Sequence, residues 1–202
     1  DRSGLVGEDG PTHSGNYDIA YLRCIPNMVI CTPSDENETR KLLTTAFLHS
    51  GPASVRYPRG TGPNSNVDKD LKPLKIGEAN IINKESSEIV ILNFGTLLNE
   101  ANQISKELKA TLVDMRFVKP LDEKLLRKIL KKAKVFISIE DGSIMGGAGS
   151  AVQEFASKEN INVRSILFGI PDKFIEHASR EEMLVEAGLD AENIKSKLSK
   201  LL

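Results

Sequence analysis

The sequence has 202 residues and a mass of 22.2 kDa, enough for one large or two small domains with a real hydrophobic core. Lysine and arginine number 27 and aspartate and glutamate 28, so the formal net charge is −1. This balance argues against a dedicated binder of nucleic acid or anionic membranes, which needs a basic excess. The 40% hydrophobic and 27% charged content is that of a globular protein and excludes disorder and coiled coil.

The cysteines, the longest apolar runs and the first residue each support one expectation about the protein. Cys24 and Cys31 favour a reduced intracellular protein over a disulfide scaffold, and we expect both to pack in the core. Apolar runs such as residues 89–92 are strand-sized, so no membrane span is predicted. The chain opens at Asp1, inside a motif and without an initiator methionine, so we expect a fragment of a longer protein.

A connector rich in Gly, Pro, Asn and Asp divides the chain into two blocks. Such residues favour turns and cannot build a core, so the domain boundary is placed there. The predicted organisation is one unit over residues 1–62, a linker over 63–75 and a second unit over 76–202.

The first block is predicted to alternate between strands and helices. Its expected elements are a strand at 3–7, a turn-rich loop at 8–15, a short helix at 17–24, strands at 28–31 and 53–57, and a helix between those two strands. Ser34 is the predicted N-cap of that helix, since Asp35 and Glu36 follow where the helix dipole favours acids. The apolar residues expected on one face of the helix are Leu42, Leu43, Ala46 and Phe47.

The second block alternates more regularly and predicts an α/β fold. We expect a strand at 79–83 to pair with one at 88–94, and further strands at 111–117, 135–139 and 163–168. The expected helices are 97–108, one beginning at Pro120, 149–158, 180–187 and 191–201. This order implies a mostly parallel sheet covered on both faces, with ligands at the carboxyl ends of its strands.

The loop over residues 7–15 is the strongest candidate site of the first block. It brings an acid, a hydroxyl and an imidazole together in Asp9, Thr12 and His13, between glycines that allow close backbone approach. His13 could move a proton near neutral pH, and Asp9 could accept a hydrogen bond from a substrate hydroxyl. A plain Asx-type turn with an exposed histidine is the alternative.

Three arginines could hold an anion. Arg56 and Arg59 end the last strand of the first block, and Arg2 precedes its first strand. A guanidinium suits a phosphate or carboxylate held at two points, whereas pairing with surface acids is the alternative for each.

Other motifs favour structure over chemistry. The glycine-rich turn over residues 144–150 could offer backbone amides to an anion, but tight packing of a helix on the sheet is favoured. It lacks the Lys-Ser or Lys-Thr pair of a P-loop and the spacing of a dinucleotide site. The three histidines are far apart and the cysteines lack paired spacing, so no metal site is expected.

Several motifs together resemble one enzyme family. The chain carries DRSGLVGEDGPTHSG, YLRCIPNMVICTPSDENE, GPASVRYPRG, NFGTLL, LVDMRFVKPLDE and IMGGAGS. These resemble 1-deoxy-D-xylulose-5-phosphate synthases, thiamine-diphosphate enzymes related to transketolase. GEDGPTH is shared with transketolase, whereas RYPRG and LVDMRFVKPLDE are more specific to the synthases.

The resemblance implies a fold and an activity. Residues 1–62 would be the C-terminal half of a pyrimidine-binding domain, with a parallel sheet and flanking helices, and residues 76–202 a transketolase C-terminal-like domain with a mostly parallel, mixed sheet. The family condenses pyruvate with D-glyceraldehyde 3-phosphate, with loss of CO2, for isoprenoid (MEP pathway), thiamine and pyridoxal synthesis. Thiamine diphosphate and Mg2+ would be anchored mainly by an upstream portion, so the isolated fragment is expected to be inactive.

The resemblance also assigns residues and partners. His13 would hydrogen-bond substrate and assist proton transfer, Asp9 would bind the hydroxyl or aldehyde end of the acceptor, and Arg2 and Arg59 would hold its phosphate. Arg56 and Tyr57 are expected to be structural. A homodimer in the bacterial cytoplasm, or in a plastid, is implied, with no nucleic-acid or membrane partner. The alternatives are a transketolase or 2-oxo-acid dehydrogenase β-subunit relative, and a non-catalytic dimerisation or docking module.

Overall fold

The computed structural model describes residues 1–63 and 66–202. Its helices are the 3-10 helix η1 (Gly7–Asp9) and α1 (Asp18–Leu22), α2 (Glu36–Leu48), α3 (Leu98–Leu108), α4 (Glu123–Leu130), α5 (Ala148–Lys158), α6 (Arg180–Ala187) and α7 (Ala191–Leu201). Its strands are β1 (Val29–Cys31), β2 (Ala53–Val55), β3 (Asn80–Asn83), β4 (Ser86–Phe94), β5 (Ala110–Asp114), β6 (Phe117–Lys119), β7 (Val135–Ser143) and β8 (Arg164–Ile170). The predicted α/β class is confirmed.

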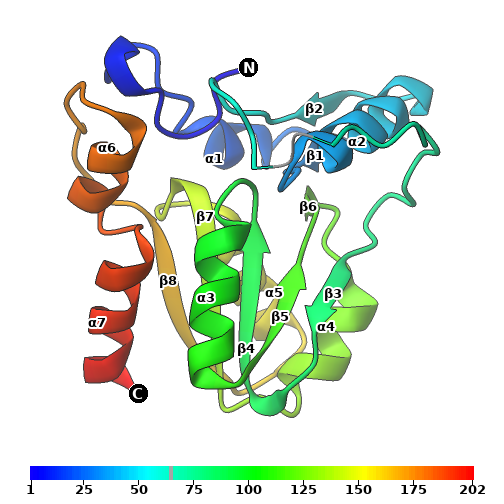
Figure 1. Cartoon of the computed structure of the whole chain (residues 1–202). Helices are drawn as coiled ribbons and strands as arrows, with labels where there is room; N and C mark the ends of the chain where they lie inside the picture. The colour runs from blue at the N-terminus through cyan, green and yellow to red at the C-terminus, as the bar shows by residue number, and fades with distance from the viewer. Residues whose placement is uncertain (64–65) are drawn as a thin grey trace.

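Two mixed sheets organise the chain (Figure 1). The smaller has the order β2-β1-β6, with β1 parallel to β2 and antiparallel to β6. The larger has the order β3-β5-β4-β7-β8 and is parallel except for the edge strand β3. Chain order reverses around β4, and in open α/β sheets ligands gather at the carboxyl ends of the strands where such a reversal occurs, here β4 and β7.

Hydrophobic cores cover both faces of the larger sheet. One core joins the sheet to α3, α6 and α7, and includes the fully buried Ile104, Met183 and Ile194. The other joins it to α4 and α5, and includes Leu126 and Phe155. Ile19 of α1 is also buried in this second core, so the first block contributes to the core of the second.

The predicted N-cap of α2 is wrong by one residue. Asp35 caps the helix, because its Oδ1 accepts a hydrogen bond from the backbone N of Glu38 at 2.8 Å. The Ser34 hydroxyl instead donates to Oδ2 of Asp114 at 2.7 Å. Asp114 is buried on the neighbouring sheet, and a buried carboxyl requires a hydrogen-bond donor.

The apolar residues of α2 are divided between the core and the surface. Leu42 is fully buried against the smaller sheet, whereas Leu43 is exposed and Phe47 is 87% exposed. A sheet of three short strands covers only a narrow part of the helix surface.

Two strand predictions in the second block are wrong. The strand near 79–83 pairs with β5 and not with β4, because β5 lies between β3 and β4. The strand predicted over 111–117 is divided into β5 and β6 at Arg116, whose φ of 58° turns the chain towards β1. The Arg116 guanidinium holds this turn through bonds of 2.7 and 2.8 Å to the carboxylate of Glu38.

The predicted strand at 3–7 is also wrong. Ser3 and Gly4 form only isolated bridges with Gly15. Gly4 and Gly7 have φ values of 69° and 65°, which are incompatible with an extended strand.

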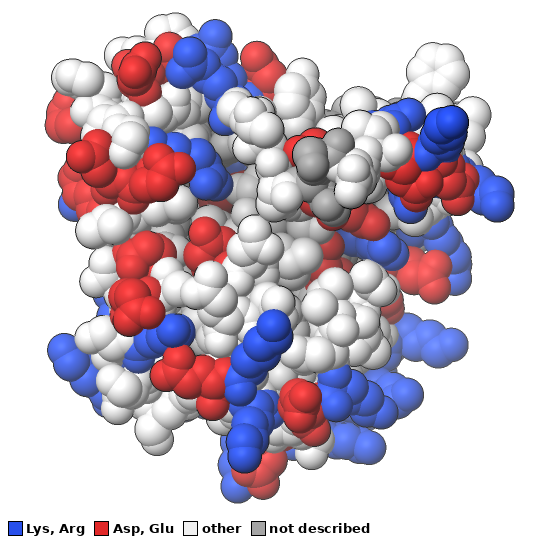
Figure 2. All heavy atoms as spheres, in the orientation of Figure 1, with Lys and Arg blue, Asp and Glu red and all other residues white. Residues whose placement is uncertain are grey.

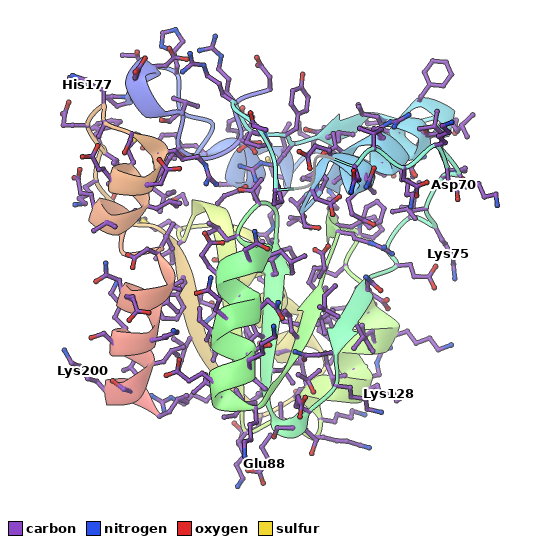
Figure 3. The ribbon with its side chains drawn as sticks, viewed as in Figure 1. Asp70, Lys75, Glu88, Lys128, His177 and Lys200 are labelled. Atoms are coloured by element: carbon purple, nitrogen blue, oxygen red, sulfur yellow. The ribbon has the colours of Figure 1, made fainter. Side chains whose placement is uncertain are left out.

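The connector lies along α2 and is hydrogen-bonded to it. Asn37 Nδ2 donates to the carbonyl of Asn66 at 3.2 Å, and Leu74 N donates to Thr45 Oγ1 at 2.8 Å. The predicted linker at 63–75 includes residues 64 and 65, which lie outside the described residues. Asp70 and Lys75 mark the connector in Figure 3. In the part of the chain that the structure describes, no helix has the length and apolarity needed to cross a membrane.

Candidate substrate-binding site

The loop between Gly4 and Gly15 is closed by its own backbone. Gly4 N donates to the Gly15 carbonyl at 2.9 Å, and Gly15 N donates back to the Gly4 carbonyl at 3.1 Å. A Cβ on Gly15 would lie 2.2 Å from the carbonyl oxygen of Arg2, so only glycine permits this closure. Ser3 N also donates to the Tyr57 carbonyl at 3.0 Å, which fixes the loop beside the segment after β2.

Three of the four predicted site residues meet at this loop. Arg2 Nη1 lies 2.9 Å from Asp9 Oδ2, and Arg59 Nε lies 3.2 Å from the same oxygen. The side chains are 36%, 27% and 48% exposed for Arg2, Asp9 and Arg59, so the cluster is open to solvent. Arg2 Nε also lies 3.6 Å from Asp1 Oδ2, so two guanidiniums meet two carboxylates here. The guanidinium donors that remain open to solvent can bind an anionic ligand.

His13 lies on the same loop and is exposed, four residues after Asp9. Its Nδ1 lies 2.9 Å from Thr12 Oγ1. Among the described residues, no side chain of the Arg2–Asp9–Arg59 cluster is hydrogen-bonded to His13. The ring is therefore accessible to a bound molecule and is held on one side by the threonine hydroxyl.

A cavity of about 880 Å³ opens beside the cluster. It lies between residues 6–8, the start of α2, the segment 57–63, Thr96 and the start of α6. Arg59 lines it, whereas Arg2, Asp9 and His13 do not. The start of α6 adjoins the loop, because a Cβ on Gly10 would lie 3.1 Å from Cβ of His177, which is labelled in Figure 3.

Sequence reasoning proposed none of the cavity residues of the second block as site residues, among them Thr96 and Arg180. Thr96 directly follows the Gly95 bend at the end of β4. Because ligands gather at the carboxyl ends of strands in such sheets, its position could have identified it. Arg180 begins a helix after an irregular segment, and no local pattern distinguishes it from a surface arginine.

Arg56 is structural, in contrast to Arg59. Its guanidinium is buried, lies 2.6 Å from Asp18 Oδ2, is ion-paired with Asp141, and donates to the Gly15 carbonyl at 2.9 Å. Burial opposes its charge, but the two carboxylates outweigh burial and raise the pKa of Arg56. Burial likewise opposes ionisation of Asp141, but the guanidinium outweighs it and lowers the pKa of that carboxyl. Arg56 thus joins the loop, α1 and β7 of the larger sheet.

The glycine-rich turn before α5 binds a carboxylate of the chain itself. Glu140 Oε2 accepts from Ala148 N at 2.8 Å, and Oε1 accepts from Gly149 N at 2.9 Å. A Cβ on Gly147 would lie 2.4 Å from Glu140 Oε2, so the turn requires glycine for packing. Burial raises the pKa of Glu140 to about 7, although the two amides act in the opposite direction. The backbone amides at the start of α5 are therefore already bound by the Glu140 carboxylate of the same chain.

Cysteines and metal ligands offer no further site. Among the described residues, no group of three or more histidine, cysteine, aspartate or glutamate side chains could hold a metal ion. Cys31 is buried as expected, and burial raises the pKa of its thiol to about 12. The expectation for Cys24 is wrong, because this residue is exposed after the short helix α1 and its Sγ donates to the Tyr21 carbonyl.

Comparison with known proteins identifies the family. Residues 77–194 match the family described as transketolase, C-terminal domain, and residues 1–64 match transketolase, pyrimidine binding domain. The chain belongs to the transketolase family. Within this family it is 53% identical over 196 residues to the 1-deoxy-D-xylulose-5-phosphate synthase of Pseudomonas fluorescens Pf0-1. It is 54% identical over 203 residues to that of Stutzerimonas stutzeri.

These alignments cover 97% and 100% of this chain but only 31% and 32% of the relatives. The chain therefore spans about a third of the length of the curated relatives it matches. Among solved structures, a split-gene transketolase, described as an inactive β4 tetramer, superposes with a TM-score of 0.82 at 26% identity, covering 94% of this chain and 62% of that one. Transketolase from Campylobacter jejuni has a TM-score of 0.72 at 18% identity over 98% of this chain and 30% of that one, which supports the fold alone.

Proposed function

We propose that the chain is the acceptor-binding part of a 1-deoxy-D-xylulose-5-phosphate synthase. The enzyme would condense pyruvate with D-glyceraldehyde 3-phosphate, with loss of CO2, and supply isoprenoid, thiamine and pyridoxal synthesis. The observation that carries the proposal is the cluster of Arg2, Asp9 and Arg59, which brings two solvent-accessible guanidiniums together on a chain similar to these synthases throughout its length.

In this proposal the two arginines hold the phosphate of the acceptor. Asp9 keeps both guanidiniums beside one another, at 2.9 and 3.2 Å from one oxygen, although their like charges repel. A phosphate dianion entering this arrangement meets donors that are already oriented, so less conformational entropy is lost on binding. Asp9 also offers its second oxygen to a hydroxyl of the acceptor.

His13 is the proposed proton-transfer residue. Its ring is exposed on the loop, and Thr12 holds its Nδ1 at 2.9 Å, so Nε2 is directed to other partners. An imidazole changes its protonation state near neutral pH and can therefore accept or donate a proton at a substrate oxygen.

Thiamine diphosphate is the proposed cofactor, and when bound it supplies the electron sink for the reaction. The described residues gather no ligand set for Mg2+, so they do not fit the metal-diphosphate end of the cofactor. We assign that end, together with Mg2+, to residues outside this chain, in keeping with its coverage of about a third of the relatives. The isolated chain is accordingly proposed to be inactive.

The remaining parts of the proposal concern organisation. We propose domains over residues 1–62 and 76–202 with a linker at 63–75, which is close to the family matches at 1–64 and 77–194. A homodimer in the bacterial cytoplasm is proposed, since the curated relatives are bacterial and one structural neighbour is an oligomer.

The test is an assay of the full-length gene product that carries this chain. With thiamine diphosphate and Mg2+, we expect release of CO2 from pyruvate and formation of 1-deoxy-D-xylulose 5-phosphate only when D-glyceraldehyde 3-phosphate is supplied. His13→Ala is expected to lower kcat by about 10²-fold or more, as for loss of a general acid or base. A folded protein that forms no such product, or forms it equally with unrelated acceptors, contradicts the proposal.

A further inference from the structure

Most of the residues that line the cavity of about 880 Å³ beside the loop have no role in the proposed function. Its volume is in the range of small-molecule sites. One wall comes from residues 6–8 and 57–63 of the first block, and another from Thr96 and residues 178–181 of the second. Only Arg59, among the proposed binding residues, lines it.

Arg180 is held in this cavity by a neutral partner. Its Nη2 lies 3.1 Å from Thr96 Oγ1, and in the part of the chain that the structure describes it forms no ion pair with a carboxylate. The Thr96 hydroxyl donates its proton to Asp141 Oδ2 at 3.0 Å, and its oxygen accepts a hydrogen bond from Arg180. Asp141 is buried and fixed by Arg56. The Arg180 charge is therefore oriented without being neutralised.

Arg59 and the start of α6 flank the same dipeptide of the loop. Arg59 Nη1 donates to the Val6 carbonyl at 3.3 Å. A Cβ on Gly7 would lie 3.8 Å from the backbone N of Arg180. Arg59 of the first block and Arg180 of the second therefore both lie near residues 6 and 7, and both line the cavity, as does Arg40 of α2.

Acidic residues also line the cavity and define the ligand class. Glu8 lines it from η1 and Glu181 from α6, and Asp35 and Glu36 line it at the start of α2. Carboxylates accept hydrogen bonds from hydroxyl groups but repel a bare anion. A lining of arginines, carboxylates and the hydroxyls of Ser179 and Thr96 therefore suits a compound that carries both phosphate and hydroxyl groups.

We propose that the cavity receives the phosphorylated polyhydroxy acceptor and product next to the Arg2–Asp9–Arg59 cluster, and that Arg180 adds a third guanidinium to Arg2 and Arg59 at the phosphate. The inference rests on the proposed function, which it deepens by assigning a binding residue to the C-terminal block. Thr96 is a positioning residue, because it orients Arg180 and is itself oriented by Asp141.

The test compares substrates with and without the phosphate in the full-length protein. For Arg180→Gln we expect KM for D-glyceraldehyde 3-phosphate to rise about tenfold or more, the effect of losing one charge-assisted bond. KM for unphosphorylated D-glyceraldehyde and kcat should not change, and Arg180→Lys should restore part of the affinity. Arg164→Gln is the matched control, an exposed arginine at the amino end of β8. Titration of D-glyceraldehyde 3-phosphate by calorimetry gives a second readout that requires no turnover.

The outcomes separate this inference from the proposed function. If Arg59→Gln raises KM for the phosphorylated acceptor and Arg180→Gln does not, the role of Arg180 is wrong and the proposed function stands. An equal rise of KM for both acceptors in Arg180→Gln also overturns the inference, because it indicates a structural role. If the full-length protein forms no product, the proposed function fails, and weaker calorimetric binding by Arg180→Gln than by Arg164→Gln still supports the site.

Discussion

Arg56 and Arg59 are three residues apart in the same RYPRG motif and lie in different surroundings. Arg56 is buried between Asp18 and Asp141, whereas Arg59 is half exposed beside Asp9. The motif predicts two guanidiniums at the end of a strand but not which of them is buried, since that depends on carboxylates far away in the sequence. The family resemblance made the distinction that residue chemistry alone left open.

The buried ion pairs of Arg56 lead to a first prediction. Arg56→Met removes the cation and leaves Asp141 buried without its charge partner, so we expect a loss of about 3–5 kcal/mol in the free energy of unfolding. Urea denaturation of this chain measures the loss, with Arg164→Met as the control at an exposed position. A loss no larger than that of the control would mean that Arg56 does not hold the two blocks together.

At the scale of helices and strands, local sequence signals were informative and long-range pairing was not. The bounds of α6 and α7 agree with the predicted 180–187 and 191–201, because caps and apolar spacing are local. The partner of β3 and the division between β5 and β6 depend on where distant strands lie. The course of the connector along α2 likewise depends on tertiary contacts, which the spacing of apolar residues in the sequence does not reveal.

The capping of α2 can be tested residue by residue. Asp35→Ala removes the acceptor of the Glu38 amide and should destabilise the protein by about 1 kcal/mol. Hydrogen exchange of the Glu38 amide should become faster in this variant and stay unchanged in Ser34→Ala, since Ser34 bonds to Asp114. The reverse pattern would restore Ser34 as the cap.

The carboxylate at the start of α5 predicts a pH dependence of stability. The folded protein raises the pKa of Glu140 from 4.5 to about 7, so it binds this proton more tightly than the unfolded chain does. Stability from this group is therefore present below about pH 4.5 and is lost as pH rises to about 7. Asp114, whose pKa burial also raises to about 7, adds a change of the same sign.

Glu140→Gln isolates the contribution of this one group. We expect the fall in Tm between pH 5 and pH 8 to be smaller in the variant than in the parent protein, with the remainder due to Asp114 and other groups. Thermal unfolding followed by circular dichroism across this range provides the comparison. Parallel curves for the two proteins would show that Glu140 does not titrate there.

At the scale of the whole molecule, the two blocks are joined by more than a linker. The strand β6 of the second block completes the smaller sheet, and Ile19 of the first block is buried in the core of the second. Charges of both signs are interspersed over the face shown in Figure 2, in agreement with the net charge of −1. The cavity between the blocks exists only because of this docking, so it could not be predicted from either block alone.

The sequence and the family resemblance predicted the loop and four of its functional candidates, and the structure brings Arg2, Asp9 and Arg59 together. The cavity residues Thr96 and Arg180 come from segments about 80 to 180 residues away and carry no local motif. Arg180 lies near the loop because α6 packs on η1, and Thr96 is hydrogen-bonded to Arg180.

The most direct measurement of the central claim is the pair of Michaelis constants for Arg59→Gln in the full-length protein. Arg59 contacts Asp9 and lines the cavity, so we expect KM for D-glyceraldehyde 3-phosphate to rise about tenfold or more while KM for pyruvate is retained. An unchanged KM for the phosphorylated acceptor would contradict the assignment of this cluster to the acceptor phosphate.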